Sequence, residues 1–323
     1  MSTPSRAFAP AYAVRPLAWT AASLAESRAW VFEAPAEVEP DVRALEAWAT
    51  READPCAALR AESVSTPALD TLADAMAREL DFGSGIAWIR GFSGLAELTL
   101  RLVYLKLGLA LGPTVDTYGR LYDVKDTGVS YKDKPIPVSQ TKESTGMHTD
   151  SSGKHVRPGV IGLACVRQAS KGGGSRIVSA AQAHEALREK HPRLLERLYG
   201  SFVRDVVTPG SDRDLERVAA NRFPVFSYEG RIAMRYMRYW IERGHARVGE
   251  ALSPEDLEAF DALDAALEDP AHVLAFRMAP GDLLFIDNTT TAHDRDAYED
   301  DPASPRLMLR LWLDHRVASE TSA

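Results

Sequence analysis

A histidine and an aspartate stand two positions apart at His148 and Asp150, inside the stretch "TKESTGMHTDSSGKHVRPG" of residues 141–159. In a strand or an extended turn, residues i and i+2 project to the same side, so an imidazole nitrogen and a carboxylate oxygen would reach one cation. The pair would supply two ligands of a two-histidine, one-carboxylate metal site. Because the chain has eight histidines and 46 acidic residues, a chance surface pair stays open at this point.

A third ligand is offered by His293, in the stretch "APGDLLFIDNTTTAHDRDAYEDDPASPRLMLRLWLD" of residues 279–314. Pro280, Gly281 and Asp282 predict a tight turn, and "LLFI" predicts a buried strand. The polar run "DNTTTAHDR" is expected to leave that strand as a loop and to present His293 at the mouth of the sheet. Such a histidine suits a metal site, with an ordinary surface histidine as the alternative.

The run "RLMLRLWL" alternates in a way that places two arginines on one face of a strand. That face carries Arg306, Met308, Arg310 and Trp312, and the other face carries four leucines. Two interpretations fit the pattern: an amphipathic strand whose arginines face water, or arginines held inside a barrel that pair bidentately with a carboxylate.

A glycine-rich turn, "KGGGSRIVSA" at residues 171–180, is expected to reverse the chain so that the hydroxyl of Ser175 opens the next strand. Taken alone, this is only a turn.

The elements that must position these residues are helices early in the chain and short strands later. Apolar spacings of three and four predict helices over 40–53, 66–80 and 95–111, the second with Thr66 as N-cap and Pro67 at the first helical position. A helical pair is predicted over 180–199, and another helix begins at Ser253, followed by Pro254. Strands are predicted at 85–92, 160–166, 175–179, 201–207, 223–228, 231–236, 273–278, 282–287 and 306–313. This order predicts an α+β fold, a jelly roll or related double-sheet barrel with helices packed outside it.

Composition narrows the class of ligand. The 323 residues are 45% hydrophobic and 26% charged, which suits one large domain, and the formal charge of -8 is scattered rather than clustered. We therefore expect a small-molecule ligand rather than nucleic acid or a membrane. The chain has no signal-peptide pattern, so a cytoplasmic location is expected, and Cys56 and Cys165 are expected to be incidental thiols.

Together, the four features resemble the taurine dioxygenase-like and clavaminate synthase-like (TauD/TfdA) branch of the Fe(II)/2-oxoglutarate-dependent oxygenases. The family pattern is His-X-Asp or His-X-Glu, a glycine-rich turn ending in Thr or Ser, a distal histidine after a "GD" strand, and then an arginine a dozen or so residues later. This chain has "HTD", "GGGS", "GDLLFIDNTTTAH" and "RLMLR" in that order, over about residues 85–314. Serine replaces the commoner threonine in the turn.

The resemblance implies one oxygenase domain over 1–323 with a double-stranded β-helix (jelly-roll, cupin-like) core. It also implies a helix-rich N-terminal region over about 1–84 and an active-site lid over about 115–146. Its implied metal ligands are His148, Asp150 and His293 for Fe(II), with 2-oxoglutarate and O2 as cosubstrates. Arg306, helped by Ser175, matches the residue that pairs with the distal carboxylate of 2-oxoglutarate.

The resemblance also favours a small acidic or amino-acid-like substrate, with Arg310, Gln140 and Arg235 as expected contacts. Arg235 and Arg238 are alternatively a structural pair. Hydroxylation is expected, while desaturation, cyclisation and epoxidation use the same iron site. Halogenating relatives lack the carboxylate that Asp150 supplies. From other classes, a non-redox metal hydrolase or a non-catalytic β-barrel binding protein remains an alternative, and a homo-oligomer is left open.

Overall fold

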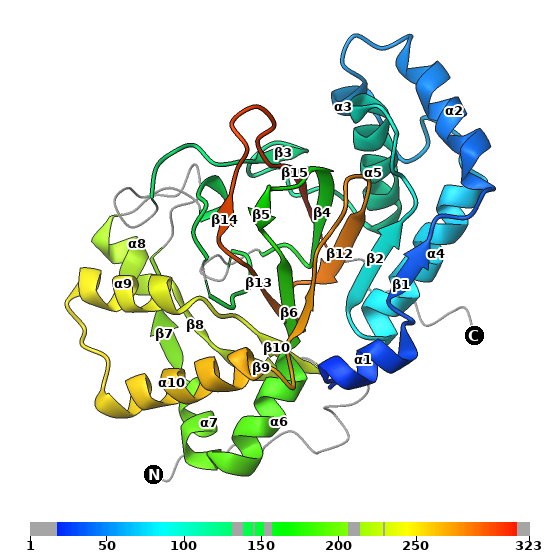
Figure 1. The fold of residues 1–323 in the computed structure, drawn as a ribbon. Helices are drawn as coiled ribbons and strands as arrows, with labels where there is room; N and C mark the ends of the chain where they lie inside the picture. Colours follow the sequence, from blue (N-terminus) through cyan, green and yellow to red (C-terminus); the bar gives the residue numbers. More distant parts are fainter. Residues whose placement is uncertain are drawn as a thin grey trace.

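The computed structural model describes residues 18–130, 138–144, 146–151, 157–205, 214–228 and 230–314, and two β-sheets lie at its centre with helices on their outer sides (Figure 1). The larger sheet has the order β1 (Val31–Glu33), β2 (Ile86–Arg90), β12 (Leu283–Asp287), β4 (Val160–Arg167), β15 (Leu307–Leu313) and β3 (Tyr122–Val124). The smaller sheet has the order β11 (Leu274–Phe276), β6 (Ser175–Ser179) and β13 (Thr291–Arg295). Neighbouring strands in both sheets are antiparallel except β1 and β2.

Three two-stranded pairs accompany these sheets in the described part of the chain. They are β5 (Lys171–Gly172) with β14 (Tyr298–Glu299), β7 (Ser201–Val203) with β8 (Arg222–Pro224), and β9 (Phe226–Tyr228) with β10 (Ile232–Met234).

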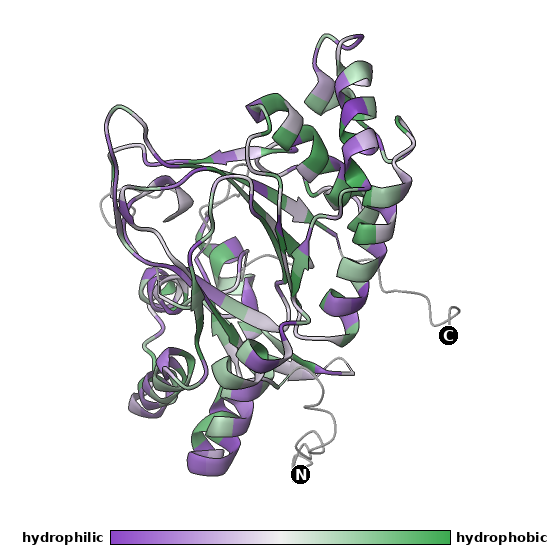
Figure 2. Cartoon of the chain, turned by 45° about the vertical axis from the view of Figure 1, so that its right-hand side comes forward, coloured by the Kyte–Doolittle hydropathy of each residue, from purple (hydrophilic) through white to green (hydrophobic). Residues whose placement is uncertain are grey.

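Helices of the N-terminal region cover the outer face of the larger sheet. They are α2 (Val38–Ala49), α3 (Pro55–Ala58), α4 (Pro67–Phe82) and α5 (Glu97–Leu111). Helix α1 (Ala21–Ser27) instead lies beside β11 of the smaller sheet. Helix α5 is mostly buried and packs with α2 and α4 in one apolar cluster, which includes Leu309, Leu311 and Leu313 of β15. Figure 2 shows hydrophobic colour gathered where these helices meet the sheet. The large apolar area removed from water there is the main stabilising term of this layer.

A second apolar cluster joins the smaller sheet to the C-terminal helices. The helices of this side are α6 (Ala180–Lys190), α7 (Pro192–Leu198), α8 (Leu215–Ala220), α9 (Arg238–Val248) and α10 (Pro254–Glu268). A short 3-10 helix, η2 (Val138–Gln140), lies in a different part of the chain. The cluster brings α6, α7 and α10 against Val178 of β6 and Ala292 of β13. Helix α10 begins with the predicted Ser253 cap, a capping box with Asp256.

The space between the two sheets holds a third cluster. It contains Ile177 of β6, Leu274 of β11, Ile286 of β12, and Met308 and Trp312 of β15. The inward faces of the two sheets therefore look at each other across a partly apolar interior, and the functional side chains project into this interior.

Most predicted elements are present, with three informative differences. The strand predicted at 223–228 is broken at Val225 into β8 and β9, and helices α1, α3, α8 and α9 were not predicted. The prediction that "DNTTTAHDR" is a polar loop is wrong, because residues 291–295 form strand β13. Thr291 of this strand is buried because its hydroxyl has a partner: Thr291 Oγ1 donates to the carbonyl of Asp287 at 2.6 Å.

Thr66 precedes α4 as predicted, but its side chain does not cap the helix. Instead, Oδ2 of Asp41 accepts from the N–H groups of Ala68 and Leu69 at 2.8 and 2.9 Å. The expected lid over 115–146 lies partly outside the described residues, as does the start of the N-terminal region. Among described helices, none has the length and apolar character needed to cross a membrane.

Candidate functional site

The two histidines are held side by side by the backbone. His293 lies in β13, and His148 forms an isolated antiparallel bridge with it. The His148 N–H donates to the His293 carbonyl at 3.0 Å, and the His293 N–H donates to the His148 carbonyl at 2.9 Å. The imidazole rings have centroids 4.5 Å apart as a result. Rigid backbone pairing thus joins two segments that are far apart in the sequence.

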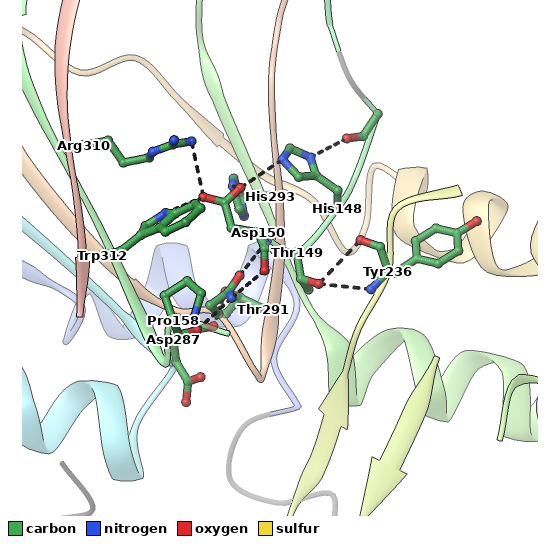
Figure 3. A network of polar contacts seen from close by, with 12 residues as sticks. His148, Thr149, Asp150, Pro158, Tyr236, Asp287, Thr291, His293, Arg310 and Trp312 are labelled. Carbon is green, nitrogen blue, oxygen red and sulfur yellow. Dashed lines mark hydrogen bonds and ion pairs between the residues drawn. The ribbon is translucent and has the colours of Figure 1, made fainter. Parts of the chain in front are cut away.

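Asp150 is fixed through its backbone by Asn288, which follows β12 directly. Oδ1 of Asn288 accepts from the Asp150 N–H at 2.8 Å, and its Nδ2 donates to the carbonyls of Asp150 at 3.0 Å and Pro158 at 2.9 Å. Thr149 lies between His148 and Asp150 in the sequence, and its side chain points the other way. Its backbone N–H donates to the Tyr236 carbonyl at 2.7 Å. The alternation expected for His148 and Asp150 is therefore present (Figure 3).

The three side chains meet at one point. Oδ1 of Asp150 lies 3.6 Å from Nε2 of His148 and 3.8 Å from Nε2 of His293. One ligand atom from each of the three residues lies within 4.8 Å of the others, a spacing that fits a single metal ion. Nδ1 of His148 lies 3.0 Å from the Gly146 carbonyl, so an Nδ1–H tautomer leaves the Nε2 lone pair facing Asp150.

The charges around the three side chains shift their pKa values in ways that favour cation binding. Burial would raise the pKa of the Asp150 carboxyl, but the hydrogen bond of His148 and the positive charge of Arg310 hold that pKa well below its usual range. Burial and the charge on His148 lower the pKa of His293 to about 4. Burial opposes protonation of His148 as well, but contact with Asp150 outweighs it and raises its pKa. Asp150 is thus ionised and His293 neutral near pH 7, as metal ligation requires.

Arg310 lies beside the carboxylate under a set of aromatic rings. Its Nη1 is 3.7 Å from Oδ2 of Asp150, and its guanidinium carbon lies 4.6–5.0 Å from the ring centroids of Trp312, Tyr122 and Tyr118. Arg310 is buried, and its Nη2 has no hydrogen-bond partner in the described structure. Of the two interpretations of the alternating run, the buried one holds for Arg310, which lies in the interior between the two sheets.

Two more guanidiniums lie around Tyr298, one from buried Arg306 and one from half-buried Arg295. Arg306 and Arg295 have their guanidinium carbons 5.1 and 4.8 Å from its ring centroid. Burial and the charge of Arg295 lower the pKa of Arg306 to about 10. Nη1 of Arg306, Nε of Arg295 and the Tyr298 hydroxyl are all buried without a hydrogen-bond partner among the described residues. Neither arginine forms an ion pair with a described acidic side chain, so an anion would be stabilised here.

The glycine-rich turn brings its neighbours toward Arg306. Gly172 and Gly173 have φ of +68° and +69°, and a Cβ on Gly172 would meet the Ala297 carbonyl oxygen at 2.2 Å. A Cβ on Gly173 would lie 3.4 Å from Nε of Arg306. Ser175 follows in β6, paired with Arg295 of β13. The predicted turn is confirmed, whereas a contact between Ser175 and a cosubstrate stays a prediction.

The two remaining predicted contacts fall in different places. Gln140 donates through Nε2 to the Tyr122 hydroxyl at 2.7 Å, which connects it to the ring beside Arg310. Arg235 follows β10 and lies with its guanidinium carbon 4.4 Å from the Phe223 ring centroid. Arg238 is bound by the carboxylates of Glu242, Asp261 and Asp264, so its role is to join α9 to α10. Substrate binding by Arg235 stays a prediction.

Several residues of the site were not identified from the sequence. They are Trp312, Asn288, Tyr118, Tyr122, Arg295 and Tyr298. For Trp312 a signal existed, because the alternation of β15 already placed it on the face of the two arginines. For Asn288 and Tyr298 only tertiary contact reveals the role.

The donor set fits iron. Two imidazoles and one carboxylate on one side of a metal position form the arrangement that non-haem Fe(II) oxygenases use, with the other positions open. Arg306 and Arg310 then offer two separate cationic contacts in the same interior.

Comparison with known proteins points the same way. A sequence profile of the family described as "Taurine catabolism dioxygenase TauD, TfdA family" matches residues 49–312. The chain is 30% identical over 250 residues to FR-33289 synthase of Streptomyces rubellomurinus (strain ATCC 31215), covering 73% of this chain and 70% of that protein. It is 32% identical over 188 residues to uridine-5'-phosphate dioxygenase of Streptomyces sp, covering 54% of this chain and 63% of that protein.

Among solved structures, the non-heme iron oxygenase OrfP in complex with Fe and alpha-ketoglutaric acid superposes with a TM-score of 0.64. The identity is 16%, and the match covers 88% of this chain and 94% of that chain. At this identity the likeness concerns the fold.

Proposed function

The chain belongs to the taurine catabolism dioxygenase TauD, TfdA family and is a non-heme iron, 2-oxoglutarate-dependent dioxygenase, and we propose that it hydroxylates a small acidic or amino-acid-like substrate. Fe(II), 2-oxoglutarate and O2 are its cofactor and cosubstrates. Family membership speaks against the alternatives of a metal hydrolase and a non-catalytic binding protein. The finer fold assignment, a double-stranded β-helix core in a single oxygenase domain, belongs to this proposal and is supported by the two facing antiparallel sheets.

The single observation that carries the proposal is the meeting of His148, Asp150 and His293 around one point. We assign these three residues as the metal ligands. Fe(II) bound there supplies the activation of dioxygen and the oxidation of an unactivated C–H bond. The protein holds the ligand atoms in place through the His148–His293 bridge and the Asn288 contacts. The apolar residues between the sheets keep water away from the reacting atoms.

The distal carboxylate of 2-oxoglutarate is assigned to Arg306. Support comes from the unpartnered Nη1 of this buried arginine and from the neighbouring guanidinium of Arg295. One buried and one half-buried cation, neither with a described carboxylate partner, favour one anion between the sheets. Ser175 pairs with Arg295 across the smaller sheet and is proposed to help at the same end.

The substrate is assigned to the aromatic-lined arginine, Arg310, with Gln140 and Arg235 as further proposed contacts. An arginine under three rings whose Nη2 lacks a partner suits a carboxylate or phosphate group of a small molecule. One relative is named for uridine-5'-phosphate, and OrfP has been solved with (3S)-hydroxy-L-Arg. Anionic and amino-acid-like molecules are therefore the first compounds to test.

An anaerobic titration of the purified protein with Fe(II) and 2-oxoglutarate tests the cosubstrate assignment through the metal-to-ligand charge-transfer band. A succinate-coupled screen of amino acids, small acids and nucleoside monophosphates then tests the substrate class. We expect the band to appear and an acidic or amino-acid-like compound to stimulate succinate release. Failure of the band to appear would refute the site assignment, and stimulation only by compounds with neither an acidic nor an amino-acid group would refute the substrate class.

A further inference from the structure

The two oxygens of the Asp150 carboxylate have different surroundings. Oδ1 faces Nε2 of both histidines, at 3.6 and 3.8 Å. Oδ2 accepts a hydrogen bond from Nε1 of Trp312 at 2.8 Å and lies 3.7 Å from Nη1 of Arg310. Figure 3 shows Trp312 and Arg310 on one side of the carboxylate and the histidines on the other. One oxygen is thus directed to the metal position, and the other is bound to the protein.

The indole that holds Oδ2 has little freedom to move. Trp312 is 7% exposed and belongs to the cluster between the sheets. Its ring packs edge-on against Tyr118 at 5.2 Å and lies 4.6 Å from the Arg310 guanidinium carbon. The strand pairing of Trp312 with Ile161 fixes its backbone. An indole N–H donates and cannot accept, so its burial is favourable only while an acceptor such as Oδ2 remains in place.

We propose that Trp312 is a positioning residue that keeps Asp150 a one-oxygen metal ligand. The inference rests on the proposed metal site. A carboxylate released from this hydrogen bond is free to turn and offer both oxygens to the metal. The second oxygen would then occupy one of the positions that 2-oxoglutarate and O2 need. Trp312 would thus act on cosubstrate binding without touching the cosubstrate.

The same contact gives Trp312 a second neighbour of functional interest. Its ring forms one wall around Arg310, the proposed substrate contact, while its N–H holds the metal carboxylate. Removal of the N–H alone separates these two roles, because the ring wall then remains. The decisive substitution therefore keeps the shape of the ring and deletes the donor.

The chain offers a matched control. Trp88 donates through Nε1 to Oδ2 of Asp282 at 3.2 Å, a second partly buried tryptophan–aspartate hydrogen bond. This pair joins β2 to the turn before β12, with none of the metal ligands in it. Trp88→Phe therefore reports the general cost of losing such a bond, and Trp312→Phe adds any effect specific to the site.

The experiment compares Trp312→Phe, Trp312→3-benzothienylalanine and Trp88→Phe with the wild type. In the second variant, sulfur replaces the indole N–H in a ring of nearly the same shape, so it tests the donor even if the Phe variant folds poorly. Three quantities are measured: the affinity of the metal-free protein for Fe(II), the d–d absorption spectrum after Co(II) loading, and the anaerobic affinity for 2-oxoglutarate. None of them depends on turnover.

For both Trp312 variants we expect metal affinity to fall about 10- to 100-fold, as for other residues that orient metal ligands. The Co(II) spectrum should change in band position and intensity, because ligand number changes, and 2-oxoglutarate affinity should fall. Trp88→Phe should leave all three unchanged. Wild-type affinities and an unchanged Co(II) spectrum in the benzothienyl variant would overturn the inference. Failure of the wild type itself to bind Fe(II) would instead refute the proposed function.

Discussion

Both faces of strand β15 are buried, but their side chains have different roles. Its outward residues Leu309, Leu311 and Leu313 lie in the apolar cluster beneath α5, where contact with hydrocarbon is all that they require. Its inward face carries Met308, Arg310 and Trp312, and the last two contact the Asp150 carboxylate. All seven residues of the strand are buried. Burial alone therefore does not distinguish a core residue from a functional one.

The distinction lies in unmet hydrogen-bonding capacity. Arg306 and Arg310 each have a buried nitrogen without a partner in the described structure, an arrangement that costs stability unless a ligand completes it. The outward leucines have no such requirement. We infer that the outer face mainly determines stability and the inner face mainly determines ligand binding. Substitutions on each face test this division.

Removal of a metal ligand should produce the largest effect. Asp150→Ala should abolish Fe(II) binding and substrate-dependent succinate formation, because the ionised carboxylate supplies the only negative charge in the proposed ligand set. The variant should still fold, but the midpoint of thermal unfolding should fall, because Trp312 Nε1 and the Arg310 guanidinium lose the carboxylate beside them. Asp150→Gly should likewise lose hydroxylation, even if chloride enters the freed position and iron is retained. Equilibrium dialysis and the succinate assay measure these outcomes.

A buried aspartate on the outer side of the larger sheet is the control. Asp41→Ala removes the acceptor of the Ala68 and Leu69 N–H groups and should cost about 1 kcal/mol of unfolding free energy, typical of a lost helix cap. Its Fe(II) affinity should equal that of the wild type. Loss of iron in Asp41→Ala, or its retention in Asp150→Ala, would contradict the division between the two faces.

Arg306→Ala should weaken cosubstrate binding. The loss of a buried, charge-assisted contact is worth on the order of 2 to 5 kcal/mol, so 2-oxoglutarate affinity should fall by tens-fold or more. Arg306→Lys should recover only part, because it keeps the charge and loses the planar fork. The charge-transfer band measures both. Unaltered cosubstrate affinity in Arg306→Ala would mean that another cation binds the distal carboxylate. Arg295, which lies by the same Tyr298 ring, would then be the first candidate.

The sequence predicted those parts of the site that local spacing controls. The i, i+2 relation of His148 and Asp150 and the alternation of β15 require only strand geometry, and both are present. The Trp312–Asp150 hydrogen bond spans 162 positions, and the Asn288–Asp150 bonds span 138. No periodicity encodes such pairs, because they depend on how distant strands meet.

Strand β13 was missed for a related reason. A run of threonines, an aspartate and a histidine reads as a loop unless one knows that its polar groups find partners inside. Asp287 accepts from the N–H and hydroxyl of Thr289 at 2.7 and 2.6 Å, so the turn before the strand provides its own hydrogen bonds. Local polarity indicated exposure, whereas tertiary hydrogen bonding allowed burial.

The outer face can be tested through the close approach of α5 to β15. A Cβ on Gly108 would lie 2.2 Å from Cδ2 of Leu311, so Gly108→Ala should destabilise the protein despite the better helix propensity of alanine. Leu311→Ala alone should cost about 2–5 kcal/mol of unfolding free energy. Leu311→Ala also removes the side chain that the new methyl group of Gly108→Ala would meet. The variant that carries both substitutions should therefore be more stable than the sum of the two separate losses predicts. Denaturant unfolding measures all three, and additive losses would contradict the close packing.

Arg310→Ala should have a selective effect on substrate binding. Arg310 lies four residues after Arg306, about 13 Å along the strand, close enough to share an interior and far enough to bind a different ligand. A hydrogen bond to a charged group is worth about 1.5–3 kcal/mol, so KM for the substrate should rise by about tenfold or more while 2-oxoglutarate affinity stays nearly constant. Some uncoupling of succinate release from product formation is expected, because the substrate would be held less firmly. Gln140→Ala, which removes only the bond to Tyr122, should raise KM less. If cosubstrate affinity fell in Arg310→Ala and not in Arg306→Ala, the roles of the two arginines would be reversed. Arg310 would then bind 2-oxoglutarate, and Arg306 would bind the substrate.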